Sequence, residues 1–176
     1  MRVISGKYRG KQIKPPGTIK ARPTTDFAKE SLFNILMNWV DFEETDVLDL
    51  FAGTGSITYE FASRGARSVV AVEREPAHYR FIRKTVDELD MDPVTVIRGD
   101  AFRYLRKPCQ SFDLIFADPP YDHPGLVSLP DMVFSTGILE TGGRFILEHP
   151  GSLSFTAHPR FLQHRGYGGV NFTFFG

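Results

Sequence analysis

Cysteine is nearly absent from this 176-residue sequence, which contains only Cys109. A single thiol cannot form an internal disulfide, and it cannot supply a cysteine-based zinc site. The five histidines do not show the spacing of metal ligands either. We therefore expect no metal site.

Long apolar runs and a targeting segment are also missing. No stretch approaches the ~20 apolar residues that a helix needs to cross a bilayer. The first residues, Met-Arg-Val-Ile-Ser-Gly, lack the apolar centre of a signal peptide. We therefore expect a cytoplasmic protein without a membrane segment. A hydrophobic content of 41% with 16 phenylalanines indicates a packed chain, and the length fits a single domain over residues 1–176.

Net charge is zero, yet acidic residues are missing from the first 25 positions. The remainder carries 14 basic and 21 acidic side chains, a net charge of −7. A basic N-terminal segment on an acidic body is typical of a protein that meets nucleic-acid phosphates. A solvated, lysine-rich edge hairpin is the alternative. The candidates for RNA contact are Arg2, Lys7, Arg9, Lys11, Lys14 and Arg22.

The order of the predicted elements indicates an α/β domain. A basic hairpin extension (1–20), with strands at 2–5 and 11–14, precedes an N-terminal helix (23–40) that Thr24, Thr25 or Asp26 could cap. Strands and helices then alternate through a core at 45–176, which predicts a parallel sheet covered by helices. The expected strands are 47–51, 68–73, 94–98, 112–117 and 143–149, and the expected helices are 56–64, 76–90, 101–106 and 127–136. A C-terminal antiparallel hairpin (161–166 and 170–175) makes this a Rossmann-like, doubly wound mixed sheet.

The fourth predicted core strand ends abruptly in Asp118-Pro119-Pro120-Tyr121. Neither proline can donate to a strand ladder, so the backbone there is stiff and rich in acceptors. A carboxylate and a carbonyl beside an aromatic ring suit a planar base with an exocyclic amine, because the acceptors bind the amine protons and the ring stacks. An ordinary Asp-Pro turn is the alternative.

Three other strands also end in residues suited to a ligand, since the carboxyl ends of parallel strands share one edge of the sheet. The first strand leads into Asp49-Leu-Phe-Ala-Gly53-Thr-Gly55, the second ends in Glu73, and Asp100 follows the third. The dinucleotide fingerprint places a third glycine where this chain has Thr58. Asp49 would repel a pyrophosphate, but it suits the cationic end of S-adenosylmethionine (SAM), while Glu73 suits the two ribose hydroxyls. Each acid alone could instead cap a helix or face solvent.

These residues resemble the class I SAM-dependent methyltransferases that modify exocyclic amines, whose four-residue motif is Asp/Asn-Pro-Pro-aromatic. More specifically, the chain resembles the bacterial 16S rRNA (guanine-N2) methyltransferase family. The resemblance spans the chain and is carried by 2–10, 22–26, 31–34, 49–55, 63–66, 118–121, 148–149 and the closing aromatic segment. Residues 57–60 depart from the smaller residues usual there, and little room for a helix follows Glu148.

The resemblance implies a set of site residues. Asp49, Gly53 and Gly55 would hold the methionine part of SAM, Glu73 its ribose, and Asp100 with the Ala101 amide its adenine. The full implied cofactor set is Asp49, Phe51, Gly53, Thr54, Gly55, Glu73, Arg74, Asp100 and Ala101. The implied catalytic set is Asp118, Pro119, Pro120 and Tyr121.

The implied function is methylation of the N2 amine of a guanine in 16S rRNA, by a monomer acting on ribosomal RNA or the small ribosomal subunit. Adenine-N6 methylation of DNA or RNA is the alternative, because the same motif serves adenine amines. A non-catalytic RNA-binding assembly module on this scaffold is a second alternative, and an NAD-linked dehydrogenase is a third.

Overall fold

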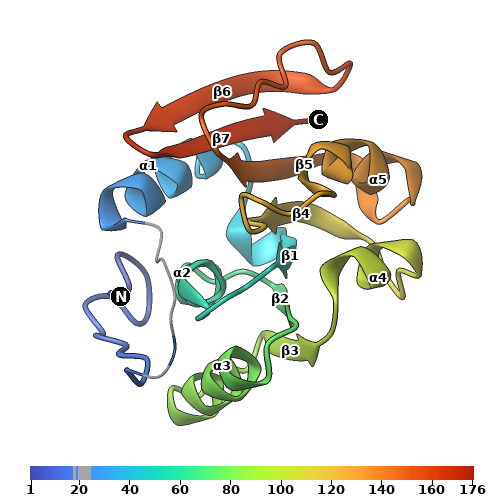
Figure 1. The fold of residues 1–176 in the computed structure, drawn as a ribbon. Coiled ribbons are helices and arrows are strands. Elements are labelled where there is room, and N and C mark those ends of the chain that lie inside the picture. The colour runs from blue at the N-terminus through green and yellow to red at the C-terminus, as the bar shows by residue number, and fades with distance from the viewer. Residues whose placement is uncertain (18, 20–24) are drawn as a thin grey trace.

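A seven-stranded sheet forms the centre of the computed structural model, which describes residues 1–17, 19 and 25–176. Its strand order is β3-β2-β1-β4-β5-β7-β6 (Figure 1). The first five strands in that order are parallel, and β7 and β6 complete the edge as antiparallel strands. The predicted doubly wound mixed sheet is therefore confirmed. The strands are β1 (Asp46–Leu50), β2 (Ser68–Glu73), β3 (Val94–Arg98), β4 (Phe112–Ala117), β5 (Leu139–His149), β6 (Phe161–Tyr167) and β7 (Val170–Phe175).

Helices cover both faces of the sheet. Alternate residues of β4 show the division: Leu114 and Phe116 pack with the helices α1 to α3, while Ile115 and Ala117 pack with α4 and α5. The helices are α1 (Asp26–Leu36), α2 (Ser56–Ser63), α3 (Pro76–Glu88), α4 (Ala101–Arg106) and α5 (Leu129–Ser135), with short 3-10 helices η1 (Phe42–Glu44) and η2 (Leu126–Ser128). None of the helices in the described residues is long and apolar enough to cross a bilayer.

Several predicted boundaries were wrong for identifiable reasons. Helix α1 is capped by the predicted Thr25 but ends at Leu36, because the chain turns there and brings Trp39 edge-on to Phe174 at 5.2 Å. The helix expected at 127–136 is split into η2 and α5, whose first turn contains Pro130. Helix α3 stops at Glu88, before Asp90 adopts a left-handed φ of 49°.

The two strands expected at 2–5 and 11–14 pair antiparallel over a shorter stretch than predicted: a bridge joins Arg2 and Gln12, and the Val3 and Ile13 amides donate to the Lys11 and Met1 carbonyls (3.1 and 3.0 Å). Other amides of the same segment bond to α2. Lys7 N–H donates to the Ser63 carbonyl (2.7 Å), and Tyr8 N–H donates to the Ser63 hydroxyl (2.9 Å). These contacts are possible because Gly6 lies so close that a Cβ there would be 1.7 Å from the Ser63 carbonyl oxygen.

A buried charge cluster fixes the same segment to the helices. The Glu60 carboxylate accepts hydrogen bonds from the Ile4 and Ser5 amides (2.8 and 3.1 Å). It also pairs with Arg64 at 2.8 Å and with Lys29 at 3.7 Å. Burial lowers the pKa of Lys29, and the nearby Glu60 carboxylate opposes that change. Glu60 is part of the departure at 57–60, and its role is to hold the basic segment against α2.

Candidate functional site

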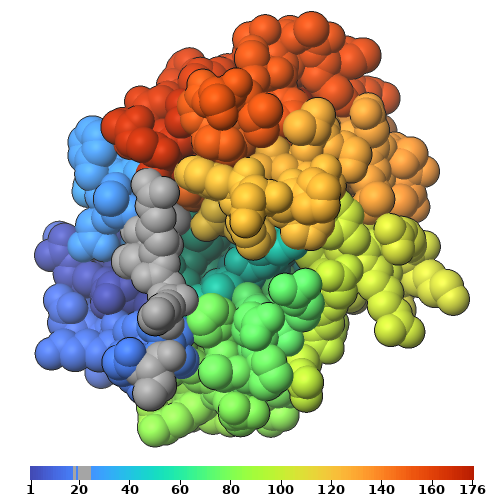
Figure 2. All heavy atoms as spheres, viewed as in Figure 1, coloured from blue at the N-terminus to red at the C-terminus, as the bar shows by residue number. Residues whose placement is uncertain are grey.

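A cavity of about 460 Å³ opens at the carboxyl ends of the parallel strands. Its size is in the range of small-molecule sites. The surface is hollowed where the teal, green and gold parts of the chain meet (Figure 2). The cavity is lined by residues from the strand ends and the loops that follow them, and the predicted residues among them are Asp49, Phe51, Gly53, Thr54, Glu73, Arg74, Asp100, Ala101, Asp118, Pro119, Pro120 and Tyr121.

The loop after β1 has an unusual backbone. Phe51, Gly53 and Gly55 have φ values of 61°, 57° and 83°. A left-handed φ is strained for a bulky residue such as Phe51, and such strain is concentrated at functional sites. A Cβ at Gly53 would meet only the Phe51 carbonyl oxygen, at 3.8 Å, so the cavity side of the loop is open. Gly55 does not line the cavity; it makes room for the Tyr59 ring, which a Cβ there would approach to 2.6 Å.

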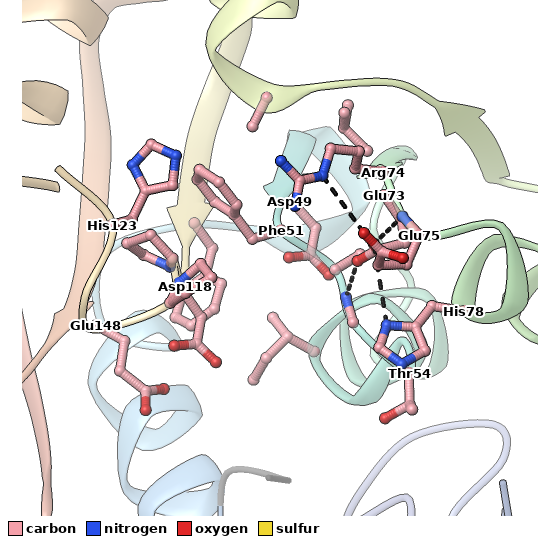
Figure 3. Close-up of a pocket in the computed structure, with 18 of the residues that line it drawn as sticks. Asp49, Phe51, Thr54, Glu73, Arg74, Glu75, His78, Asp118, His123 and Glu148 are labelled. Atoms are coloured by element: carbon pink, nitrogen blue, oxygen red, sulfur yellow. Dashed lines mark hydrogen bonds and ion pairs between the residues drawn. The ribbon is translucent and has the colours of Figure 1, made fainter. Parts of the chain in front are cut away.

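Glu73 is held rigidly at the end of β2. One carboxylate oxygen accepts from the Gly53 amide (2.7 Å) and the other from the Glu75 amide (2.6 Å). A carboxylate has about four acceptor positions, so the two oxygens keep capacity for further donors, and His78 Nδ1 lies 3.9 Å from one of them. Figure 3 shows this group on one side of the cavity, with Arg74 beside it in an ion pair with Glu75.

Asp49 lies deeper, at 1% exposure, and accepts a hydrogen bond of 2.5 Å from the Thr58 hydroxyl. Burial raises the pKa of Asp49 to about 7, against the opposing effect of the Thr58 hydrogen bond. Thr58, which stands where a dinucleotide-binding site has its third glycine, thus orients the Asp49 carboxyl group. An acid at this depth favours a cationic ligand group, which would recover the free energy lost on burying the charge.

Asp100 has two roles that the sequence presented as alternatives. Its side chain caps α4 by accepting from the Arg103 amide at 2.9 Å, and the residue also lines the cavity beside Ala101. The capped helix start fixes the backbone of both residues in the cavity wall.

The segment Asp118–Tyr121 forms the opposite wall. The Asp118 amide lies 3.4 Å from the Leu50 carbonyl of the neighbouring strand, which fixes the turn against β1. Figure 3 shows the Asp118 and Glu148 side chains extending into the same space, across from Glu73. The Tyr121 hydroxyl donates to the Glu148 carboxylate at 3.2 Å, so β5 orients the tyrosine ring.

Sequence reasoning missed Glu148 as a site residue, although it ends a parallel strand as the four predicted acids do. It also left His123 outside the site. The His123 ring stacks on Phe102 at 4.6 Å and 10°, and its Nδ1 accepts from the Gly125 amide. Its place two residues after Tyr121 is the sequence signal for a position near the substrate, whereas its stacking on Phe102 comes from another element.

The basic residues Arg2, Lys7, Arg9, Lys11 and Lys14 are all exposed and none lines the cavity. Arg22 lies outside the described residues. Within the described chain, no group of three histidine, cysteine or acidic side chains could hold a metal ion.

The cavity fits SAM by the chemistry of its lining. Glu73 offers acceptors for two hydroxyls, Asp49 offers a negative charge at depth, and the open side of Gly53 leaves room for a ligand against the loop. These three features lie in one cavity with Asp118, which makes a second reactant at that carboxylate possible.

Comparison with known proteins gives consistent results. A model of the family described as "Conserved hypothetical protein 95" matches residues 1–176. The "Ribosomal RNA small subunit methyltransferase D" of Buchnera aphidicola (subsp. Baizongia pistaciae) is 31% identical over 154 residues, covering 88% of this chain and 78% of that protein.

Solved structures are similar over the same core. The Thermus thermophilus protein TTHA0928 superposes with a TM-score of 0.84 at 28% identity, covering 99% of this chain and 98% of its own. The T. thermophilus 16S rRNA N2 G1207 methyltransferase, solved with SAM and guanosine, has a TM-score of 0.67 at 24% identity, covering 86% of this chain and 43% of its own. The second match shows a shared fold.

Proposed function

We propose, from the premise that this chain belongs to the family described as "Conserved hypothetical protein 95", that it transfers the methyl group of SAM to the N2 amine of a guanine in small-subunit ribosomal RNA. One observation carries the proposal. Asp118 at the end of β4 faces the same cavity as the Gly53 loop and Glu73, so an amine acceptor and the residues suited to SAM lie together (Figure 3).

When bound, SAM supplies a methyl group on a cationic sulfur. Glu73 would hold the ribose hydroxyls, Asp49 would face the cationic end, and Asp100 with Ala101 would hold the adenine. These roles use strand-end residues whose backbone is fixed by β1, β2 and α4.

Asp118 and the Pro119 carbonyl act on the target amine. The lone pair of a guanine 2-amino group is delocalised into the ring, which makes the nitrogen a poor nucleophile. Acceptors on the two amine protons favour a pyramidal nitrogen and return electron density to it. As the C–N bond forms, the bond from the methyl carbon to sulfur breaks and leaves its electron pair on sulfur, so the positive charge passes to the nitrogen. The Asp118 carboxylate would stabilise that charge until one amine proton is released to solvent.

Tyr121 would stack on the face of the base and so restrict its rotation about the amine. Its own ring is oriented by the hydrogen bond to Glu148. Holding two reactants in line can lower a barrier by several kcal/mol, and this positioning is the main contribution expected from the chain. A base in a helix or loop must leave its stack to reach the cavity.

Replacing Asp118 by Ala tests the assignment. We expect methyl transfer to fall by at least about a hundredfold, while SAM affinity measured by calorimetry stays within about twofold, since Asp118 contacts the amine rather than the cofactor. The exposed Asp87→Ala on α3 is the matched control and should behave as the wild type.

The assay is transfer of labelled methyl from SAM to undermethylated small ribosomal subunits, followed by nucleoside analysis. N2-methylguanosine supports the proposal, N6-methyladenosine supports the adenine alternative, and no transfer supports a non-catalytic module. Near wild-type turnover in Asp118→Ala would refute the assigned role of this carboxylate.

Two further expectations belong to the proposal. A monomer acting in the cytoplasm, where ribosomal subunits assemble, is consistent with methylation of rRNA. Sedimentation with and without rRNA tests whether the protein is a monomer, and fractionation of cells tests whether it lies in the cytoplasm.

A further inference from the structure

Phe27 is the most exposed large apolar side chain in the described residues, at 68% exposure. It lies in the first turn of α1 and meets the ring of Tyr167, at the end of β6, edge-on at 5.8 Å and 81°. The phenylalanines of β7 are buried, so this pair differs from the rest of the aromatic C-terminal segment. We call Phe27 and Tyr167 the aromatic shelf.

Contacts of neighbouring residues connect the shelf to the border of the cavity. On one side, Tyr167 precedes the Gly168–Gly169 turn, and the Gly169 carbonyl lies 3.5 Å from the Tyr121 hydroxyl. On the other side, Lys29, two residues after Phe27, donates from Nζ to the hydroxyl of Ser56, a residue that lines the cavity, at 3.3 Å. The elements that carry the shelf, α1 and the turn between β6 and β7, therefore contact the start of α2 and the Asp118–Tyr121 wall of the cavity.

Cations flank the shelf. Arg2 is half exposed and lies 3.5 Å from Asp26, the residue before Phe27. Arg165, two residues before Tyr167, is exposed as well. An exposed ring with cations on neighbouring residues is an arrangement by which proteins bind single-stranded RNA, with bases on the aromatic faces and phosphates on the cations.

We propose that the aromatic shelf stacks a nucleobase next to the target guanine in the RNA. The inference rests on the proposed function. When the target base leaves its stack to reach Asp118, a neighbouring base loses a stacking partner, and the open face of Phe27 replaces it. Stacking on a ring accepts any base, so the shelf contributes affinity and register rather than sequence reading.

The test compares Phe27→Ala and Phe27→Trp with Leu162→Ala, an exposed apolar residue near the other end of β6. With undermethylated small subunits, Phe27→Ala should raise the KM for RNA about tenfold, the equivalent of ~1.4 kcal/mol, because base–aromatic stacking has that magnitude. The KM for SAM should stay unchanged. Phe27→Trp should restore the wild-type KM, and Leu162→Ala should not alter it.

An unchanged KM for RNA in Phe27→Ala would refute base stacking on the shelf, as would an equal change of that KM in Leu162→Ala. A parallel loss of SAM affinity would overturn it too, since that result indicates a role in folding of the cavity. Direct binding of single-stranded rRNA fragments separates this inference from the proposed function. If the wild type transfers no methyl group, the proposed function is refuted. Tenfold weaker binding of the fragment by Phe27→Ala would still support base stacking on the shelf, and equal binding by variant and wild type would refute it.

Discussion

Asp49 provides the sharpest test of how the cavity is built, because its carboxyl group is buried beneath the loop at 1% exposure. Burial raises its pKa from 3.8 to about 7. The unfolded chain ionises this group near pH 4, whereas the folded chain resists ionisation until about pH 7. The contribution of Asp49 to stability is therefore fully present below pH 4 and is lost as the pH rises toward 7.

The loss is large enough to measure. A pKa difference between 3.8 and about 7 corresponds to ~4 kcal/mol of unfolding free energy. Asp49→Asn keeps the shape and an oxygen for the Thr58 hydroxyl but cannot ionise. We expect similar stabilities of the two proteins near pH 4, and a variant more stable by up to ~4 kcal/mol at pH 8.

Urea unfolding followed by the fluorescence of Trp39, the single tryptophan, measures this difference without SAM. His149 has a pKa lowered by burial, so its effect has the opposite sign and destabilises the fold as the pH falls below 6.5. It is common to both proteins and cancels in their difference. If the unfolding free energies of the wild type and of Asp49→Asn change in parallel with pH, the raised pKa assigned to Asp49 is refuted.

Cofactor binding supplies the second half of the test. If the cationic end of SAM faces Asp49, binding favours the ionised carboxylate, and SAM affinity should rise between pH 6 and 8 by up to about tenfold per pH unit. The Asn variant should bind SAM more weakly and without that dependence. Equal affinities and equal pH profiles would show that the cationic end lies elsewhere.

Two other predictions concern the basic segment. The buried Val3, Tyr8 and Ile13 anchor it to the body, so its charges should be tested by substitution rather than by deletion. Changing Lys7, Arg9, Lys11 and Lys14 together to Gln should weaken RNA binding and leave SAM affinity unchanged. The slope of the logarithm of the RNA association constant against the logarithm of the salt concentration should become shallower by up to about 3. If variant and wild type bind RNA equally at every salt concentration, the segment does not belong to the RNA interface. Lys29→Met should lower the unfolding free energy by ~3–5 kcal/mol, because Glu60 loses a buried partner. The double variant Lys29→Met/Glu60→Gln should recover part of that loss, and failure to do so would contradict the assigned ion pair.

Much of the core could be read from local patterns. Strands β2, β3, β4 and β7 and helix α4 have the predicted bounds, because apolar runs closed by charged, proline or glycine residues mark their ends. Boundaries that depended on tertiary packing were wrong. Trp39 has helical spacing from Leu32 and Ile35, yet it reaches Phe174 from a turn. The N-terminal segment pairs as a short hairpin, but further amides of it bond to Glu60 and Ser63, which no local pattern showed.

The sequence by itself determined the chemistry of the site. Glycines, acids and the Asp-Pro-Pro-Tyr segment follow strands, and the edge shared by parallel strands brings such residues together whatever the details of packing. Only the tertiary structure decided how each side chain is held: Thr58 against Asp49, two amides on Glu73, and Glu148 on Tyr121. It also decided that Phe27 meets Tyr167. These contacts join residues from different elements, and their distances depend on how helices pack on the sheet, which no local pattern encodes.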